Sequence, residues 1–276
     1  MKELKYKLIS CDMDDTLIGR ENTVSKRNLE AIREFERRGG VFMANTGRMH
    51  ASAIQRVREM GLLKNSPVSS FQGAMIRESV TDKLLFYKPL GYELSLRAVT
   101  DAESMGIFTQ VYDMGKLYFV NPPKDKFNYG VKYAERCGVG YVNVASLSGY
   151  IREKKMDCVK VLIMDEPERI QKHLEFFAEK YGYKVNLNTS APFMGEIFSI
   201  EAGKDVACAV MCGKLGITIE ECMAIGDSMN DYNMLKRAGL GVAVANARSE
   251  VLEIADYVVD SCEDDGVAKA IERFCL

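Results

Sequence analysis

Four short segments, far apart in the chain, carry the residue types that transfer of a phosphoryl group requires. They offer a carboxylate nucleophile, a second carboxylate for proton transfer, a hydroxyl and a cation for a phosphate, and acids for Mg²⁺. The segments are Asp12-Met13-Asp14-Asp15-Thr16, Thr46-Gly47-Arg48, Lys204 and Gly226-Asp227-Ser228-Met229-Asn230-Asp231. We therefore predict a Mg²⁺-dependent phosphatase that forms an aspartyl-phosphate.

The proposed chemistry explains why several acids are needed. A phosphate monoester is a dianion, so it repels a carboxylate nucleophile strongly in a dry pocket. Mg²⁺ removes this repulsion by bridging carboxylate and phosphate oxygens, and it prefers a few carboxylates with water completing an octahedron. Such a site needs acids from separate loops, together with a fixed cation and hydrogen-bond donors for the remaining phosphate oxygens.

Three carboxylates receive separate roles from their positions. Asp12 lies at the carboxyl end of the first predicted strand, which is the usual ligand edge of an open α/β sheet, and it is the predicted nucleophile. If the chain turns after Asp12, the Asp14 side chain points in a different direction from that of Asp12. We expect Asp14 to protonate the leaving oxygen and then deprotonate the attacking water. Asp227 completes the predicted metal site.

The remaining polar groups are expected to bind the phosphate. Thr46 ends the second predicted strand, and its hydroxyl can hold a phosphate oxygen together with the Gly47 amide. Lys204 is a compact cation that can neutralise the phosphate and the intermediate. Asn230 and Asp231 are expected to orient water, phosphate or the lysine.

Each segment has a plainer explanation when it is taken alone. Asp-x-Asp is common in solvated turns, and Thr-Gly-Arg after a strand is usually turn chemistry. Lys204 alone would be an exposed lysine at a helix start, and Asp227 and Asp231 could cap a helix N-terminus. All four segments occur in order at predicted strand ends or helix starts, and this combination favours catalysis.

Composition restricts the setting and the partners. The chain has 276 residues, 47% apolar and 28% charged, with a net charge of −2, so it has no general attraction for nucleic acid or an anionic membrane. No apolar stretch approaches the roughly 20 residues that span a bilayer, and the charged N-terminus does not resemble a signal peptide. Zinc-site spacing is not found among the Cys and His residues. We expect a cytoplasmic protein whose partner is a small phosphorylated metabolite.

Strand-like and helix-like apolar periods alternate through most of the chain, which predicts an α/β fold. Predicted strands at 6–11, 41–44, 221–225, 240–244 and 257–259 alternate with amphipathic helices, which favours parallel strands joined by right-handed crossovers. The first of these helices is expected to begin after an N-cap at Ser25.

The middle of the chain follows a different pattern. A hairpin is predicted from 107–112 and 116–120, followed by a strand at 159–164 and a long helix at 166–181. Because Asp12 and Asp227 must share one site, we predict a discontinuous catalytic core at 1–84 and 190–276, with a second domain at 85–189 inserted into it.

At this point the chain resembles a known group, the haloacid dehalogenase (HAD) superfamily, and within it the Cof-type phosphatases of subfamily IIB with a C2B cap. The similarity rests on Asp-Met-Asp-Asp-Thr-Leu, Asn-Thr-Gly-Arg, Lys204 and Gly-Asp-Ser-Met-Asn-Asp, and it covers essentially the whole chain. It implies a Rossmann-like parallel-sheet core, an inserted α/β cap and Mg²⁺-dependent hydrolysis of sugar phosphates or related metabolites, such as phosphorylated cofactors.

The resemblance also implies roles for individual residues. Asp12 and Asp14 would be the catalytic pair. Mg²⁺ would be held by the Asp12 carboxylate, the Asp14 main-chain carbonyl and Asp227. The phosphate would meet the Met13 amide, Thr46, Gly47, Lys204 and Asn230. Supporting roles fall to Thr16, Arg48 and Asp231.

Two positions depart from the family pattern. Asp15 stands where the family often has Gly, and Asp can occupy the turn conformations that Gly favours. Gln72 stands where Asn is frequent before Gly-Ala, which affects the expected leaving-group preference more than the chemistry.

The predicted insertion is expected to act as a lid that excludes water and selects the leaving group. Its cations are expected to lie mostly on a solvated surface, with some meeting a second anionic or polyhydroxyl group. These cations are Lys124, Lys126, Arg152, Lys154, Lys155 and Lys160.

Three other functions could use a similar set of residues. A phosphomutase or phosphotransferase would pass the phosphoryl group from Asp12 to a sugar instead of water. A receiver-like signalling module would need slow hydrolysis of its acyl phosphate, and Asp14 argues against that. The intact set of motifs disfavours a binding protein with a decayed site.

Overall fold

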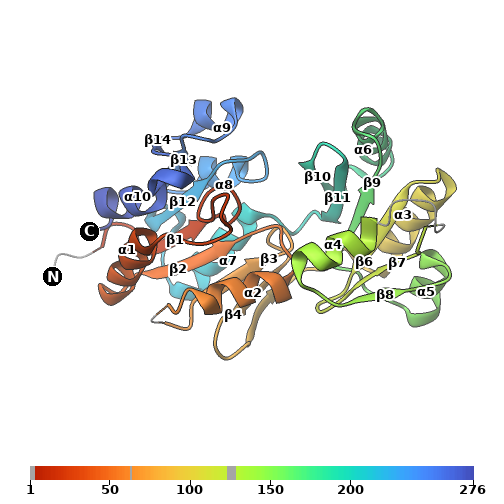
Figure 1. Ribbon diagram of the computed structural model, residues 1–276, viewed down its shortest axis with the longest axis horizontal. Helices are drawn as coiled ribbons and strands as arrows, with labels where there is room; N and C mark the ends of the chain where they lie inside the picture. Colours follow the sequence, from red (N-terminus) through yellow and green to blue (C-terminus); the bar gives the residue numbers. More distant parts are fainter. Residues whose placement is uncertain (1–3, 63, 123–128) are drawn as a thin grey trace. The chain divides into compact units, whose positions relative to one another are not determined.

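The computed structural model describes residues 4–62, 64–122 and 129–276. The chain divides into two compact units (Figure 1). The first unit contains Met1–Gly47, Ala53–Tyr87 and Gly203–Leu276, and the second contains Arg48–Ser52 and Lys88–Ala202. The domain boundaries at residues 85 and 189 remain a prediction.

The first unit is built on an eight-stranded sheet in the order β14-β13-β12-β1-β2-β3-β4-β5. The strands from β14 to β3 are parallel to one another, whereas β4 and β5 pair antiparallel at one edge. The strands are β1 (Leu8–Cys11), β2 (Val41–Asn45), β3 (Pro67–Ser70), β4 (Met75–Glu78), β5 (Leu84–Tyr87), β12 (Cys222–Gly226), β13 (Leu240–Val244) and β14 (Tyr257–Val259).

Helices cover both faces of this sheet. They are α1 (Lys26–Arg37), α2 (His50–Glu59), α7 (Lys204–Leu215), α8 (Tyr232–Arg237), α9 (Ser249–Ile254) and α10 (Gly266–Phe274), with short 3₁₀ turns η1 (Ile219–Glu221) and η2 (Cys262–Asp264). The predicted N-cap is confirmed, because the Ser25 side chain accepts a hydrogen bond from the Asn28 amide in the first turn of α1.

The alternation of side chains along β1 explains why both faces need cover. Ile9 packs in a cluster with Ile32 of α1 and Ile271 of α10. Leu8 points to the opposite face, where its cluster includes Met211 of α7. Full burial of each such side chain stabilises the fold by about 1.5–3 kcal/mol. The sequence of a fully buried parallel strand is therefore apolar on both sides.

The second unit contains a mixed six-stranded sheet in the order β10-β11-β9-β6-β7-β8. Its strands are β6 (Phe108–Tyr112), β7 (Leu117–Phe119), β8 (Tyr141–Asn143), β9 (Lys160–Met164), β10 (Val185–Ala191) and β11 (Met194–Ser199). Its helices are α3 (Tyr92–Ser104), α4 (Tyr129–Cys137), α5 (Leu147–Lys154) and α6 (Pro167–Tyr181). One apolar cluster joins α3, α5 and α6 to the same face of this sheet.

One predicted surface cation of the second unit is in fact buried. The Lys160 ammonium forms an ion pair with the buried Glu196 carboxylate and lies 5.1 Å from the centre of the Tyr112 ring. The expectation of a solvated side chain is therefore wrong for Lys160. Lys124 and Lys126 lie outside the described residues.

The predicted fold class is confirmed, with a mainly parallel core sheet and a separate mixed sheet. The 107–120 hairpin is confirmed by the antiparallel pair β6 and β7. The sequence analysis did not predict β3, β4 and β5 of the core sheet, nor β8, α3, α4 and α5 of the second unit.

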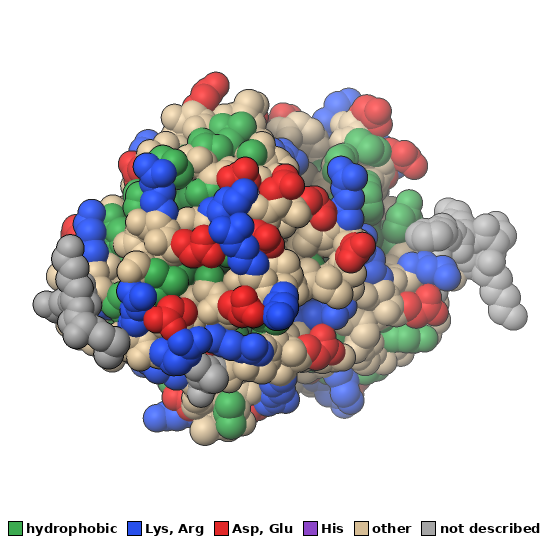
Figure 2. Space-filling model, turned by 60° about the vertical axis from the view of Figure 1, so that its left-hand side comes forward, with side chains coloured by type: hydrophobic (Ala, Val, Ile, Leu, Met, Phe, Trp, Pro, Cys, Tyr) green, Lys and Arg blue, Asp and Glu red, His purple; other side chains and the backbone are tan. Residues whose placement is uncertain are grey.

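The surface and the helix lengths bear on possible partners. Lys and Arg side chains are interspersed with Asp and Glu among the described residues on the face shown in Figure 2. Among the described residues, no helix is both long and apolar enough to cross a membrane.

Candidate active site

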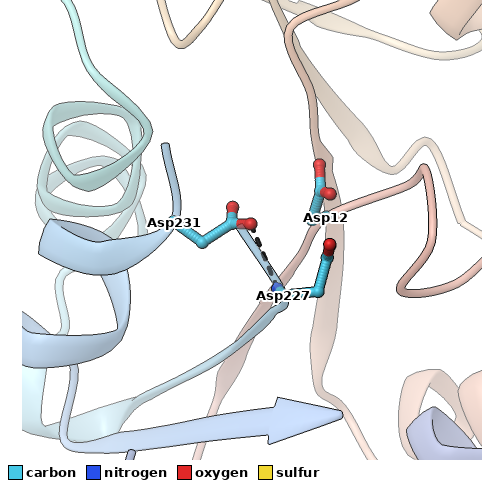
Figure 3. Close-up of side chains that lie close together, drawn as sticks. All are labelled: Asp12, Asp227 and Asp231. Carbon is cyan, nitrogen blue, oxygen red and sulfur yellow. Dashed lines mark hydrogen bonds between the residues drawn. The ribbon is translucent and has the colours of Figure 1, made fainter. Parts of the chain in front are cut away.

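Three carboxylates meet at the carboxyl end of the central strands. Asp12 follows β1 and Asp227 follows β12, and these strands are parallel neighbours with Cys11 paired to Ile225. Asp231 comes from the turn just before α8. One oxygen from each carboxylate lies within 4.8 Å of the others (Figure 3).

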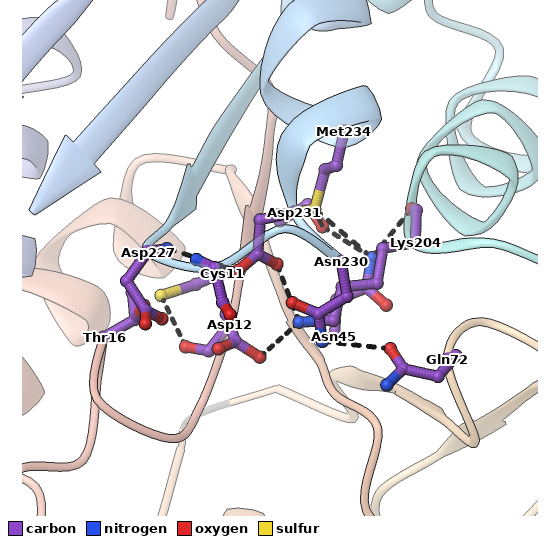
Figure 4. A network of polar contacts seen from close by, with 12 residues as sticks. Cys11, Asp12, Thr16, Asn45, Gln72, Lys204, Asp227, Asn230, Asp231 and Met234 are labelled. Atoms are coloured by element: carbon purple, nitrogen blue, oxygen red, sulfur yellow. Dashed lines mark hydrogen bonds and ion pairs between the residues drawn. The ribbon is translucent and has the colours of Figure 1, made fainter. Parts of the chain in front are cut away.

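A buried lysine neutralises part of this negative charge. Lys204 is the first residue of α7, and its Nζ lies 2.6 Å from Asp12 Oδ1 and 2.7 Å from Asp231 Oδ1 (Figure 4). The other oxygen of Asp231 accepts hydrogen bonds from the amides of Asp227 and Ser228, at 3.2 and 3.1 Å. Asp231 therefore fixes both the lysine and the loop that carries Asp227.

The single Lys204 ammonium does not fully neutralise the three carboxylates. Burial raises the pKa of Asp12 well above its usual value; the Lys204 ammonium opposes this shift, and neighbouring carboxylates add to it. Burial also raises the pKa of Asp227 to about 6, although the hydrogen bond from Thr16 lowers it. Burial lowers the pKa of Lys204, but Asp12 and Asp231 outweigh that effect and raise it above its usual range.

This donor set fits a hard divalent cation. All three side chains offer oxygen atoms, which Mg²⁺ prefers, and three carboxylates face one ammonium. A bound cation would oppose the effects of burial and of carboxylate repulsion that raise the pKa values of Asp12 and Asp227. The Asp231 oxygens already accept hydrogen bonds from Lys204 and the loop amides, so Asp12 and Asp227 are the better placed ligands.

The turn after β1 carries the second predicted catalytic acid. Asp14 is exposed there, and its charge contributes to raising the pKa of Asp12. Asp15 has a φ of 57°, the left-handed conformation that favours glycine and that aspartate also adopts. Thr16 Oγ1 donates a hydrogen bond of 2.6 Å to Asp227 Oδ1, which ties this turn to the loop after β12.

The loop after β2 carries Thr46 and Gly47, two of the predicted phosphate-binding residues. The buried Thr46 donates its amide to the Ser69 carbonyl at 3.0 Å. A Cβ on Gly47 would lie 2.4 Å from Nε2 at the end of the Gln72 side chain, so the glycine lets this side chain approach the loop closely. Gln72 Oε1 accepts a hydrogen bond of 3.1 Å from Asn230 Nδ2. Gln72 thus links the loops after β2 and β12.

Met13 and Arg48 are the remaining predicted site residues, and their predicted roles stay predictions. The Met13 side chain is buried in the core cluster of the first unit, while its carbonyl accepts hydrogen bonds from the amides of Leu17 and Ile18 and closes the turn. Arg48 belongs to the second unit, so the structure does not place it among the carboxylates.

Sequence reasoning assigned no role to two buried polar residues of this site. Asn45 ends β2 and Ser10 lies on β1, and neither is exposed to solvent. A polar residue inside an otherwise apolar buried strand is the signal that could have found them, since such groups need internal hydrogen bonds. Asn45 also directly precedes Thr46 in the sequence.

Comparisons with known proteins agree with this geometry. The family model of haloacid dehalogenase-like hydrolases matches residues 9–271. The chain is 30% identical to the putative phosphatase YxeH of Bacillus subtilis, over 98% of this chain and 99% of that protein. It is also 30% identical to the 5-amino-6-(5-phospho-D-ribitylamino)uracil phosphatase YcsE of the same organism, over 100% of this chain and 98% of that protein.

Solved structures show the same fold. A haloacid dehalogenase-like hydrolase from Bacteroides thetaiotaomicron superposes with a TM-score of 0.84 at 26% identity, covering 97% of this chain and 99% of that one. The subclass IIB sugar phosphatase BT4131 superposes with a TM-score of 0.79 at 19% identity, covering 97% and 98%, and this likeness concerns the fold alone.

Proposed function

The chain belongs to the haloacid dehalogenase-like hydrolases as a Cof-type phosphatase of subclass IIB, and on this premise we propose that it hydrolyses small phosphomonoesters through an aspartyl-phosphate on Asp12. The observation that carries the proposal is the position of Asp12. Its carboxylate lies between the Lys204 ammonium and the Asp227 carboxylate at the ligand edge of a parallel sheet.

The reaction follows from the groups around Asp12. An Asp12 oxygen bonds to phosphorus while the bond from phosphorus to the ester oxygen breaks, and Asp14 gives its proton to that leaving oxygen. Water then attacks the phosphorus of the aspartyl-phosphate, its proton passes to Asp14, and the bond from phosphorus to Asp12 breaks. Free phosphate, the Asp12 carboxylate and the protonated Asp14 result, so both side chains return to their starting states.

The phosphate oxygens are bound by groups from three loops. Thr46 and the Gly47 amide follow β2, and the Met13 amide follows β1. Lys204 neutralises charge on the phosphoryl group, and Asn230 is oriented toward this region by its hydrogen bond to Gln72. We assign Arg48 only a supporting role.

We infer that Mg²⁺ is held by Asp12, Asp227 and the Asp14 main-chain carbonyl. When bound, it screens the repulsion between the phosphate and the nucleophile. Thr16 and Asp231 support this site, because each fixes the orientation of the Asp227 loop.

The substrate class is proposed from the relatives. YcsE acts, by its name, on a phosphorylated ribitylaminouracil. We propose sugar phosphates or phosphorylated intermediates of cofactor synthesis, cleaved in the cytoplasm, with the inserted domain at 85–189 acting as a cap that selects the leaving group. A phosphotransferase that passes the group to a sugar is the alternative, since it would use the same first step.

The test is a panel of phosphorylated sugars, nucleotides and cofactor precursors, assayed for released phosphate with Mg²⁺ and after chelation. Rapid acid quenching and peptide mass spectrometry should detect a phosphorylated peptide that contains Asp12. Asp12→Asn should release no phosphate while keeping its circular dichroism spectrum. Substantial turnover by this variant would exclude Asp12 as the nucleophile, and an isomerised sugar phosphate without free phosphate would favour the alternative.

A further inference from the structure

We propose that Asn45 is a positioning residue that holds Lys204 in register with Asp12 and Asp231. The inference rests on the proposed function, in which the lysine neutralises the phosphoryl group. It concerns a residue that touches neither the predicted metal ligands nor the predicted nucleophile through its side chain, and that acts through the main chain of α7.

The contacts of Asn45 lead to the lysine directly. Asn45 Nδ2 donates a hydrogen bond of 2.9 Å to the main-chain carbonyl of Lys204, and both residues are labelled in Figure 4. It donates a second hydrogen bond, of 3.0 Å, to Ser10 Oγ. An amide nitrogen carries two protons, and these two oxygens accept both. The end of β2 is thereby joined to the first turn of α7.

The hydrogen bonds around Asn45 also extend to α8, the helix that directly follows Asp231, the second carboxylate partner of Lys204. Ser10 Oγ donates to the sulfur of Met234 at 3.2 Å, and Asn45 Nδ2 lies 3.5 Å from that sulfur. Met234 lies in α8, three residues after Asp231. One buried group of polar contacts therefore touches both helices that supply the Lys204–Asp231 ion pair.

Burial of the Asn45 side chain is energetically unfavourable, so packing alone does not explain why an asparagine occupies this position. The side chain is fully buried, and its Oδ1 has no hydrogen-bond partner among the described residues. A buried acceptor without a partner destabilises a fold, and leucine would fill similar space without that cost. A residue that lowers stability is expected where it fixes a geometry that catalysis needs.

Small displacements of Lys204 should matter for the chemistry. Its Nζ lies within 2.7 Å of two carboxylate oxygens, and a charge-assisted contact weakens when it lengthens. Because the ammonium must also meet an incoming phosphate oxygen, a shift of the α7 start by a fraction of an ångström should weaken phosphate binding.

The test is a double-mutant cycle read out by binding of inorganic phosphate in the presence of Mg²⁺. Asn45→Leu should weaken phosphate binding about tenfold and lower kcat for the best ester, because both amide hydrogen bonds are lost. Mg²⁺ affinity should change much less. In a Lys204→Met background, Asn45→Leu should have no further effect on phosphate affinity, since the group that it positions is gone.

A matched control separates positioning from general destabilisation. Asn28 is also a buried asparagine of the first unit; its Oδ1 accepts from the Ala268 amide and so joins α1 to α10. Asn28→Leu should lower the melting temperature but leave phosphate affinity unchanged. If Asn45→Leu does not fold, Ser10→Ala can be used instead, because it removes the acceptor of the second Asn45 hydrogen bond. We expect this variant to lower phosphate affinity about threefold in the wild-type background and not at all in the Lys204→Met background.

The outcomes are distinguishable from failure of the proposed function. A wild-type protein that releases phosphate, combined with losses that are equal in both backgrounds, would overturn the positioning role alone. Unchanged phosphate affinity in folded Asn45→Leu would do the same. A wild-type protein that neither cleaves esters nor binds phosphate would instead overturn the function.

Discussion

Asp227→Asn should stabilise the metal-free protein at neutral pH, even though it removes a predicted metal ligand. The pKa of Asp227 is raised from 3.8 to about 6, chiefly by burial. A carboxylate whose pKa is higher in the folded state binds its proton more tightly there than in the unfolded chain. The folded protein therefore loses stability as the pH rises through this interval, and the whole penalty is present above about pH 6.

The magnitude follows from the two pKa values. The difference between 3.8 and about 6 corresponds to about 3 kcal/mol of unfolding free energy. Asparagine keeps an oxygen that can accept the hydrogen bond from Thr16, so the replacement removes mainly the buried charge. We expect the variant to be more stable than the wild type by up to about 3 kcal/mol at pH 7.5 and by only about 0.5 kcal/mol near pH 4.

The assay is chemical denaturation of both proteins with chelator at several pH values between 4 and 8. The difference between the two proteins is the informative quantity, because the other titrating groups are shared. Mg²⁺ should reverse the order at pH 7.5 by stabilising the wild type alone. Wild-type Mg²⁺ affinity should also fall about tenfold at pH 5, since only about one Asp227 in eleven is then ionised.

Two results would refute this reasoning. One is an Asp227→Asn variant that is no more stable than the wild type at pH 7.5 without metal. The other is a stability difference that does not shrink as the pH falls, which would show that the buried charge is not its cause.

Three further predictions concern the surrounding structure. Asp15→Val should destabilise the protein by about 1–2 kcal/mol in thermal melts whereas Asp15→Gly should not, because a β-branched residue is strained at a φ of 57°. Gly73→Ala should reduce phosphate release in steady-state assays, because its Cβ would lie 2.0 Å from the carbonyl oxygen of Gly203, directly before α7; full activity would contradict the packing. Lys160→Met should lower the free energy of unfolding by about 3 kcal/mol, because the buried Glu196 carboxylate loses its ammonium partner. A double variant that also carries Glu196→Gln should recover much of that stability in the same thermal melts.

The sequence by itself determined the fold class and many of the elements. Predicted strands at 240–244 and 257–259 coincide with β13 and β14, and a helix predicted after Ser25 begins there. Apolar periodicity and helix caps are local features, so a short stretch of sequence contains the information that they need. The segments from β3 to β5 were missed because their short strands lack a clear alternation of apolar and polar residues.

Only the tertiary structure decided which of these elements are neighbours and what their polar residues touch. Sequence order does not show that β1 lies between β2 and β12, although that order brings Asp12 and Asp227 together. The hydrogen bond from Asn45 to Lys204 and the buried pair of Lys160 and Glu196 join residues far apart in the chain. No local pattern encodes such contacts, because each side chain gains its partner only when the sheet and its helices have packed.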